Sequence, residues 1–291
     1  MRLKADLTLL LIAVIWGSAF AAQRVAGQLG SVYLFNAARY LLASLVVLPF
    51  AIRAAKTAPK VSDSSTAQWL WMAAAGAVLF AAAALQQIGL LSTTAANAGF
   101  ITSLYVVLVP VALFIFWRER PHWLAILGVM LATAGAFLLS SGGRALKLQT
   151  GDIFELLGAL LWTAHVILIG KVASRFEPMA FSMGQLFICG VLNSVLGLLL
   201  ESPDAAQVRM LVVPVLYTAL FSLGMGYTLQ VWAQRHTPPA DAALILSLES
   251  VFAALAGWVV LGETLLPVQI AGCGLIFAAI LFSQARQRVS V

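Results

Sequence analysis

Charged residues are scarce in this 291-residue chain: they make up 10% of it, whereas apolar residues make up 62%. Soluble domains average about 25% charged and about 45–50% apolar residues. So few charges cannot cover the surface of a protein that faces water on all sides. The composition therefore excludes a soluble fold and predicts a polytopic membrane protein whose main solvent is the lipid bilayer.

Cysteine, clustered histidine and catalytic motifs are also rare or missing. The two cysteines, Cys189 and Cys273, lie inside apolar runs, where we expect buried free thiols. The three histidines are scattered, and neither a His–Glu metal spacing nor a Gly-x-Ser-x-Gly motif occurs. The sequence thus points away from an enzyme, a metal site or a cofactor, and no ring of like residues suggests a channel filter.

Ten runs are long and apolar enough to be spanning helices, since crossing about 30 Å of hydrocarbon takes about 20 residues. They cover residues 5–25, 31–52, 68–91, 95–116, 121–141, 152–171, 179–200, 210–234, 239–261 and 266–285. The first run continues from Leu7 to about Ala26, beyond the roughly 7–15 apolar residues of a signal peptide. We therefore expect it to remain as the first helix of an all-α membrane protein.

The basic residues predict the orientation. With the N-terminus inside, 12 of the 17 Lys and Arg residues fall on the inner side, 4 on the outer side, and Arg39 within a span. This bias predicts a bacterial-type inner membrane protein with both termini in the cytoplasm. The net charge of +6 then reflects basic loops that face anionic lipid, so we expect no nucleic-acid partner.

The chain contains one pattern twice. Leu85-Gln86 recurs as Leu229-Gln230 at a spacing of 144, and Trp16 recurs as Trp162 at a spacing of 146. These spacings define two repeats, 1–145 and 146–291, each with five predicted spans. Because five is odd, the second repeat enters the membrane upside down, an architecture frequent in transporters. We expect one membrane domain built from two inverted five-helix repeats, with a substrate cavity near the midplane between them.

Two segments resemble a known family. Val14-Ile15-Trp16-Gly17-Ser18-Ala19-Phe20 resembles the first-helix signature of the EamA-type branch of the drug/metabolite transporter superfamily, and Leu244-Ile245-Leu246-Ser247-Leu248-Glu249-Ser250 resembles its ninth-helix signature. The chain departs from the pattern at Ser250, where the family often has proline. The resemblance covers the whole chain and implies ten helices and the export of small metabolites. Within the family the chain is most similar to the YddG-type aromatic amino-acid exporters.

Tryptophan placement indicates where a substrate would bind. Six of the eight tryptophans fall near predicted membrane interfaces, as in an ordinary aromatic belt. Trp16 and Trp162 instead lie near mid-membrane, where an indole needs a packing role or a function. Trp16 shares a helix face with Phe20, and Trp162 shares one with His165. We predict that these faces form opposing walls of a central cavity, although lipid-facing or core positions remain the alternative.

The third and eighth spans supply further candidates. Phe80, Gln86, Tyr227 and Gln230 lie at mid-span or slightly displaced toward opposite sides, as inversion requires. Tyr227 is bulky and polar-tipped, so we expect it in the cavity. The glycines beside it are equally consistent with plain helix packing.

The fourth and ninth spans each present two possible faces. Ser103 and Ser247 are equivalent in the repeat, and so are Tyr105 and Glu249. Residues two apart on a helix point about 200° apart, so both pairs cannot line one cavity. We predict that the serines face the substrate. Alternatively they bond to carbonyls of their own helix.

Arg39 and Glu249 are the intramembrane charges, which are costly and usually functional. Their estimated depths differ by about 6 Å, so we predict an ion pair between the second and ninth helices. A lone Glu249 would instead suit proton coupling or a cationic substrate. Pro110 removes a backbone hydrogen bond inside the fourth span, where we expect a kink or hinge. Small residues at Gly128-Ala132-Ala136 predict close helix contacts, within the bundle or in a homodimer.

These observations predict a secondary carrier that exports small metabolites, aromatic and other apolar amino acids first, by alternating access. Stacking on Trp16 and Trp162 would hold the side chain, and His165 or Ser247 would bond to the zwitterion. An exporter of cationic drugs or quaternary amines that uses Glu249 is one alternative. A nucleotide-sugar or sugar-phosphate carrier is another, although phosphate needs basic residues and the spans offer only Arg39.

Overall fold

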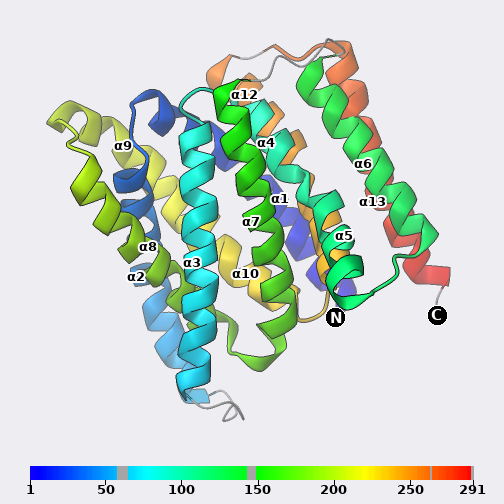
Figure 1. Ribbon diagram of the computed structural model, residues 1–291, viewed down its shortest axis with the longest axis horizontal. Helices are drawn as coiled ribbons and strands as arrows, with labels where there is room; N and C mark the ends of the chain where they lie inside the picture. Colours follow the sequence, from blue (N-terminus) through cyan, green and yellow to red (C-terminus); the bar gives the residue numbers. More distant parts are fainter. Residues whose placement is uncertain (58–64, 143–148, 263, 290–291) are drawn as a thin grey trace.

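The computed structural model describes residues 1–57, 65–142, 149–262 and 264–289, and every regular element in these ranges is a helix. The helices run between two ends of one bundle (Figure 1). The first half contains α1 (Arg2–Gln28), α2 (Tyr33–Thr57), α3 (Ser65–Gly89), α4 (Ala95–Ser103), α5 (Tyr105–Trp117) and α6 (Trp123–Ser141). The second half contains α7 (Thr150–Val172), η1 (Ala173–Arg175), α8 (Pro178–Leu200), α9 (Ala205–Tyr217), η2 (Thr218–Met225), α10 (Gly226–Ala233), α11 (Pro239–Leu246), α12 (Glu249–Leu261) and α13 (Pro267–Val289).

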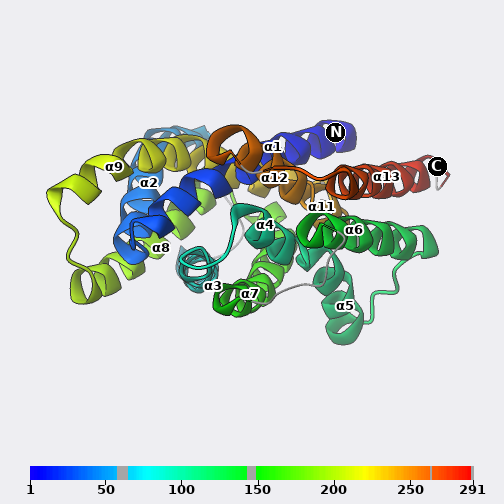
Figure 2. The same cartoon turned by 90° about the horizontal axis from the view of Figure 1, so that it is seen from above.

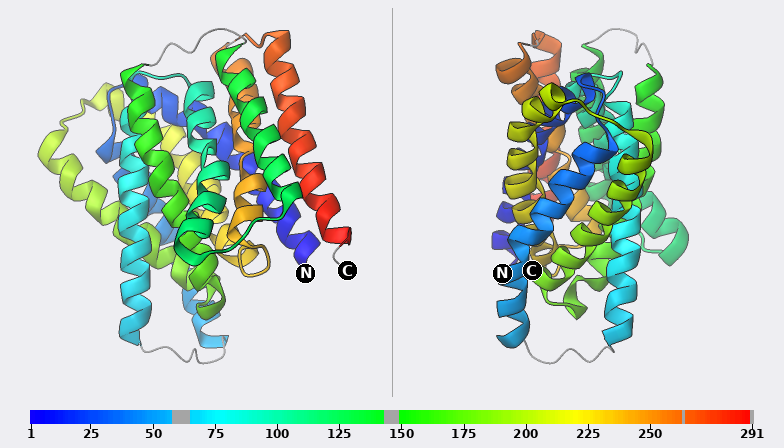
Figure 3. Two further views of the ribbon diagram at one scale, coloured as in Figure 1. Left: turned by 45° about the vertical axis from the view of Figure 1, so that its right-hand side comes forward. Right: turned by 90° about the vertical axis from the view of Figure 1, so that its left-hand side faces the viewer.

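The prediction of an all-α protein with ten spans is confirmed. Nine helical stretches among the described residues are long and apolar enough to cross a membrane, and α13 adds a shorter apolar stretch, Pro267–Ala279. Four spans consist of consecutive helical elements: α4 with α5, α7 with η1, α9 with η2 and α10, and α11 with α12. Both termini lie at the same end of the bundle, as an even number of crossings requires (Figure 3).

Polarity is distributed inside out relative to a soluble protein. Leu198, Phe116 and Val213 are each more than 70% exposed, whereas Asn36 and Gln185 are completely buried. Exposed apolar side chains on transmembrane helices gain contact with lipid, and polar side chains gain hydrogen bonds only inside the bundle. The chemistry of the protein is therefore concentrated in its interior.

The two halves pack against each other through equivalent helices. α2 packs along α8, and α6 packs along α13 to form one edge of the bundle. Seen from above, α1 lies beside α12 and α3 beside α7 (Figure 2). Gly135 and Gly272 let α6 and α13 cross closely, because a Cβ atom at either would lie within 2.5 Å of the other's carbonyl oxygen. The small residues of α6 thus make contacts within the bundle, and a homodimer stays a prediction.

The fourth and ninth spans are both broken at their serines. α4 ends at Ser103, whose Oγ donates to the Phe100 carbonyl at 2.7 Å. α11 ends just before Ser247, whose Oγ donates to the Leu244 carbonyl at the same distance. Serine hydroxyls that bond to their own backbone bend helices. The two interruptions are equivalent in the repeat and lie near the middle of their spans.

The break does not coincide with Pro110, whose role as a kink or hinge stays a prediction. This proline lies inside α5, and the helix interruption occurs at Leu104, earlier in the span. The equivalent position in the second half is Ala254, yet the ninth span is interrupted as well. The shared serine, rather than the proline, is therefore the residue that accompanies the break in both halves.

Candidate functional site

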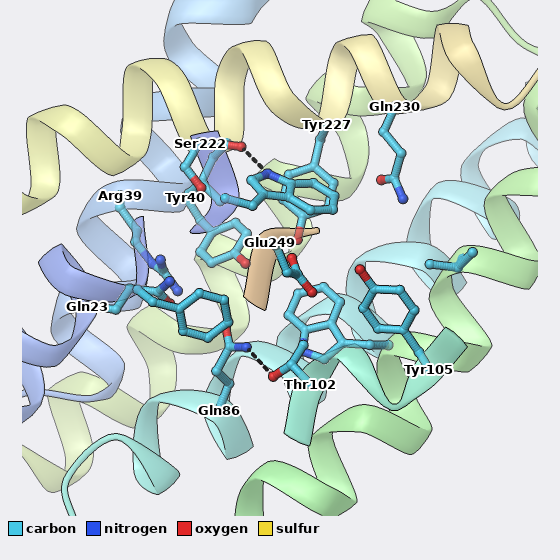
Figure 4. A pocket seen from close by; sticks show the side chains of 15 residues that line it. Gln23, Arg39, Tyr40, Gln86, Thr102, Tyr105, Ser222, Tyr227, Gln230 and Glu249 are labelled. Carbon is cyan, nitrogen blue, oxygen red and sulfur yellow. Dashed lines mark hydrogen bonds between the residues drawn. The ribbon is translucent and has the colours of Figure 1, made fainter. Parts of the chain in front are cut away.

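A pocket lies where the two broken spans meet α1, α2, α3, α7 and the η2–α10 segment (Figure 4). Its volume of about 40 Å³ holds a few water molecules. The lining residues are Trp16, Phe20, Gln23, Arg39, Tyr40, Gln86, Thr102, Tyr105, Trp162, Val166, Ser222, Leu223, Tyr227, Gln230 and Glu249. Both halves contribute to it. Four pairs are equivalent in the repeat: Trp16 and Trp162, Phe20 and Val166, Gln86 and Gln230, Tyr105 and Glu249.

Trp16 is held in place by an irregular helix. Its indole Nε1 donates to the carbonyl oxygen of Ser222 at 2.8 Å. Ser222 belongs to η2, a π-helix, and π-helical segments alter the regular pairing of backbone carbonyls. Gly226 leaves room for the indole, because a Cβ atom there would lie 2.6 Å from Trp16 Nε1. Trp162, the equivalent residue, lines the pocket with an indole N–H that has no hydrogen-bond partner.

Tyr227 lines the pocket, and His165 stands behind it. The Tyr227 ring centroid lies 5.1 Å from that of Trp16 and 5.7 Å from that of His165. His165 is completely buried, and its Nε2 pairs with Gln185 Oε1 at 2.9 Å. Phe80 also lies one layer back, packed against the cluster that contains Tyr40 and Tyr227. The structure therefore gives His165 and Phe80 positions that support the wall rather than line it.

The predicted assignment of faces on the fourth and ninth spans is wrong. Tyr105 and Glu249 line the pocket, whereas Ser103 and Ser247 are buried and bonded to their own helices. The serines end one helix, and the next begins at Tyr105 in one half and at Glu249 in the other. Each break thus directs the first side chain of the following helix into the pocket.

Arg39 and Glu249 do not form the predicted ion pair. Within the described part of the chain, ion pairs link Arg2 to Asp6, Arg2 to Asp241, and Lys171 to Glu119. The Arg39 Nε donates to Asn36 Oδ1 at 3.0 Å, and its guanidinium lies 4.9 Å and 5.1 Å from the ring centres of Phe35 and Tyr40.

Glu249 reaches the same pocket from the other half. It is 3% exposed, and its Oε1 has no hydrogen-bond partner in the structure described. As the first residue of α12, it lies at the positive end of the helix dipole, which favours a carboxylate. Figure 4 shows the side chains of Arg39 and Glu249 both pointing into the pocket. The site therefore contains one buried cation and one buried carboxyl group that are not bonded to each other.

Several lining residues escaped the sequence analysis. Gln23 follows Phe20 by three positions and Trp16 by seven, so helical spacing from Trp16 would have found it. Tyr40 follows Arg39 in the sequence, and Thr102 precedes Ser103. Only the packing shows that Tyr40 and Thr102 face the pocket. Thr102 accepts a hydrogen bond from Gln86 Nε2 at 3.1 Å. Among the residues with described positions, no group of three His, Cys, Asp or Glu side chains suits a metal ion.

Comparison with known proteins identifies relatives of the whole chain. The model of the EamA-like transporter family matches residues 3–141 and again residues 149–284. An uncharacterized transporter of Archaeoglobus fulgidus is 34% identical over 98% of this chain and 87% of its own length. One crystal structure superposes with a TM-score of 0.78 over 100% of both chains at 15% identity, which shows a common fold.

A second group of relatives matches part of the chain. The threonine/homoserine exporter RhtA of Escherichia coli K12 is 28% identical over 58% of this chain and 57% of its own length. An uncharacterized transporter of Methanothermobacter thermautotrophicus is 27% identical over 60% of this chain and 52% of its own length. The chain thus aligns with little more than half the length of these relatives.

Proposed function

The chain belongs to the EamA-like transporter family, and we propose that it is a secondary carrier that exports amino acids through the central pocket. The observation that carries this proposal is the pair of buried, mutually unbonded groups, Arg39 and Glu249, in one pocket. An amino-acid zwitterion has a carboxylate for the guanidinium and an ammonium group for the carboxylate. Binding would give both buried groups a partner of opposite charge.

The pocket walls favour an apolar or aromatic side chain on the substrate. The rings of Trp16, Tyr227 and Tyr105 line it, together with Phe20 and Trp162. Flat aromatic surfaces bind apolar and aromatic groups through burial and ring contacts. The likeness to RhtA supports an amino acid as the cargo and export as the direction, and the aromatic lining extends the substrate range beyond small polar amino acids.

The position and size of the pocket support alternating access. A volume of about 40 Å³ is too small for an amino acid, so the walls must separate before one can enter. The pocket lies between two halves whose spans are broken at equivalent serines. Rocking of one half against the other would open the pocket to each side in turn. We place the protein in a bacterial-type inner membrane, with its termini in the cytoplasm, from the distribution of basic residues.

The two alternative substrate classes fit the pocket less well. A cationic drug would have to bind near Arg39, which lies in the same pocket as Glu249. A phosphate group would find one basic residue, Arg39, and a carboxyl group beside it. A cationic drug would lie near the like charge of Arg39, and a phosphate group would lie near the carboxyl group of Glu249. Like charges in close proximity are costly inside a membrane.

Transport by the purified protein in liposomes tests the proposal. Labelled phenylalanine, tryptophan and threonine are compared with a cationic dye and a nucleotide sugar. We expect amino-acid flux, faster for the aromatic pair, that is lost in the Trp16→Ala, Trp162→Ala double variant. The matched control is Trp123→Ala, since Trp123 begins α6 outside the pocket and is 63% exposed. Flux of the dye or the nucleotide sugar without amino-acid flux would overturn the proposal.

A further inference from the structure

Behind one wall of the pocket lies a carboxyl group that the sequence analysis did not single out. Glu155 of α7 is completely buried, and its Oε2 accepts a hydrogen bond from Thr102 Oγ1 at 3.3 Å. Its Oε1 has no hydrogen-bond partner in the described structure. Gly89 of α3 leaves space for the carboxyl group, because a Cβ atom there would lie 2.7 Å from Oε1.

Among the residues that the structure describes, the helices packed around Glu155 place no compensating cation beside it. The described residues of α3 and α4, the helices against which it packs, include no titratable group. The other elements packed on α7 offer Tyr105 on α5, Asp241 on α11 and Arg175 on η1. The further carboxyls on this side are Asp152, three residues earlier on α7, and Glu249, which lines the same pocket as Thr102.

Two basic residues with described positions, one on α7 and one near its start, are distant or otherwise engaged. Lys171, on the same helix, is sixteen residues away, or roughly 24 Å along the axis. Arg24, at the same end of the molecule as the start of α7, donates to the Leu90 carbonyl. A buried carboxyl without a cation is favoured in its neutral, protonated form.

A hydrogen bond connects the Glu155 carboxyl to a residue that lines the pocket, and a second carboxyl, Asp152, lies between Glu155 and the near end of the bundle. Thr102 lines the pocket and bridges Gln86 to Glu155. Asp152 lies three residues before Glu155, on the same helix face, and accepts from Thr93 Oγ1 at 2.6 Å. Asp152 also caps the start of α7 by accepting from the Gln149 N–H. This end lies opposite the termini, so the predicted orientation places it outside.

From this geometry we propose that Glu155 is a proton-binding site that couples amino-acid export to proton entry; the inference rests on the proposed function. In the outward-open state Glu155 takes a proton from external water. In the inward-open state the O–H bond of Glu155 breaks, and its proton passes by way of the Thr102 hydroxyl to water in the pocket and then to the cytoplasm. The amino acid moves outward in the same cycle, so each crossing exchanges a proton for a substrate.

An infrared titration tests the proton site without any substrate. The purified protein is compared with its Glu155→Gln variant, which keeps the shape of the side chain. We expect the C=O stretching band of a protonated carboxyl near neutral pH in the wild type, and its loss in the variant. A band of equal intensity in both proteins would overturn the assignment, because the protonated carboxyl would then belong to another residue.

Flux measurements test the coupling. Liposomes are loaded with labelled phenylalanine and diluted into buffer of equal or lower pH. We expect external acidification to accelerate efflux, and one coupled proton to raise the steady-state ratio of external to internal phenylalanine by up to about tenfold per unit of pH difference. Glu155→Gln should keep phenylalanine exchange at equal pH and lose the acceleration. Thr102→Val should lose the acceleration but keep the infrared band. Thr102→Ser, which keeps a hydroxyl group, should retain the acceleration as well.

One control variant accompanies these measurements, and two different outcomes would contradict the coupling role and the proposed function separately. Glu119→Gln removes an exposed carboxyl outside the spans, paired with Lys171 at 2.7 Å, and should leave both exchange and acceleration intact. Acceleration that persists in Glu155→Gln would overturn the coupling role. A wild type that moves no amino acid in either assay would instead overturn the proposed function, and the infrared titration would still decide whether Glu155 binds a proton.

Discussion

The two halves of the molecule share a pocket but differ in what lies behind it. Behind the first-half side of the pocket, Gln86 Nε2 donates a hydrogen bond to Thr102 Oγ1. Thr102 Oγ1 in turn donates to Glu155 Oε2 on α7. The equivalent positions in the second half and in α1 are Gln230, Leu246 and Leu9. Leu246 and Leu9 are completely buried in one apolar cluster. Inverted repeats place these groups on opposite sides of the midplane, so the interior directly behind the pocket is polar on one side and apolar on the other. Farther from the pocket the halves are alike, because Thr237 donates to Asp6 at 2.9 Å as Thr93 donates to Asp152 at 2.6 Å.

This difference indicates which features of a duplicated transporter serve the fold and which serve the chemistry. The serine breaks and the midplane tryptophans recur in both halves, so we assign them to the opening that the proposed function requires. The hydrogen bond from Thr102 to Glu155 occurs in one half and has no counterpart at Leu246 and Leu9. A directional device needs such an asymmetry, because two identical halves would treat both sides of the membrane alike.

The largest effect is expected when the apolar half receives a carboxyl group. Leu9→Glu would bury a carboxyl among leucines with no threonine to bond to it, at a cost of about 3–5 kcal/mol. We expect a large loss of folded protein, measured by thermal unfolding in detergent. Leu9→Met, of similar volume, should cost less than about 1.5 kcal/mol. Equal stability of the two variants would contradict the view that this half requires an apolar interior.

The converse change removes the hydrogen bond from Thr102 to Glu155. The Thr102→Leu, Glu155→Leu double variant makes both halves alike behind the pocket. Replacement of both partners of a buried hydrogen bond by apolar groups can be nearly neutral or stabilising. We expect unchanged or higher thermal stability together with loss of the response to external acid. Strong destabilisation would show that the Thr102–Glu155 hydrogen bond stabilises the fold, contrary to our account.

A smaller difference is expected between the equivalent tryptophans. Trp16→Phe removes a hydrogen bond to Ser222, whereas Trp162→Phe removes an N–H without a partner. A hydrogen bond contributes about 0.5–1.5 kcal/mol net, so Trp16→Phe should be the more destabilising by about that amount. Thermal unfolding of both variants measures it. A larger loss in Trp162→Phe would contradict the described geometry.

The smallest effect concerns Pro110. Because the helix break lies at Leu104 and recurs in the second half without a proline, Pro110→Ala should leave transport within about twofold, an effect below roughly 0.5 kcal/mol. Initial rates of phenylalanine efflux measure it. Loss of transport in this variant would restore Pro110 as the hinge.

The sequence predicted the architecture because lipid exposure and helix length are local properties that composition records. The span limits follow from runs of apolar residues. The inverted arrangement follows from a repeat that contains an odd number of spans. The pocket was predicted where periodicity was clear, as for Trp16 and Trp162, or where a single mid-span residue was bulky and polar, as for Tyr227. The division of the chain at residue 145 stays a prediction.

The errors occurred where tertiary structure decides. The faces of the fourth and ninth spans were assigned on the assumption of continuous helices, and the serine breaks change which residue follows into the pocket. The Arg39–Glu249 pair was inferred from depth alone, which contains no information on rotation about the helix axis. Glu155 was overlooked because it lies near a span end, where exposure is the usual outcome, and only packing shows that it is buried.

Binding of phenylalanine and two truncated analogues tests the central claim most directly. Calorimetry would compare phenylalanine with its amide, which lacks the carboxylate, and with phenylpropionate, which lacks the ammonium group. We expect the wild type to prefer the zwitterion over both analogues, Arg39→Gln to lose the discrimination against the amide, and Glu249→Gln to lose that against phenylpropionate. Equal affinity of the wild type for all three compounds would contradict a pocket built to bind an amino acid between Arg39 and Glu249.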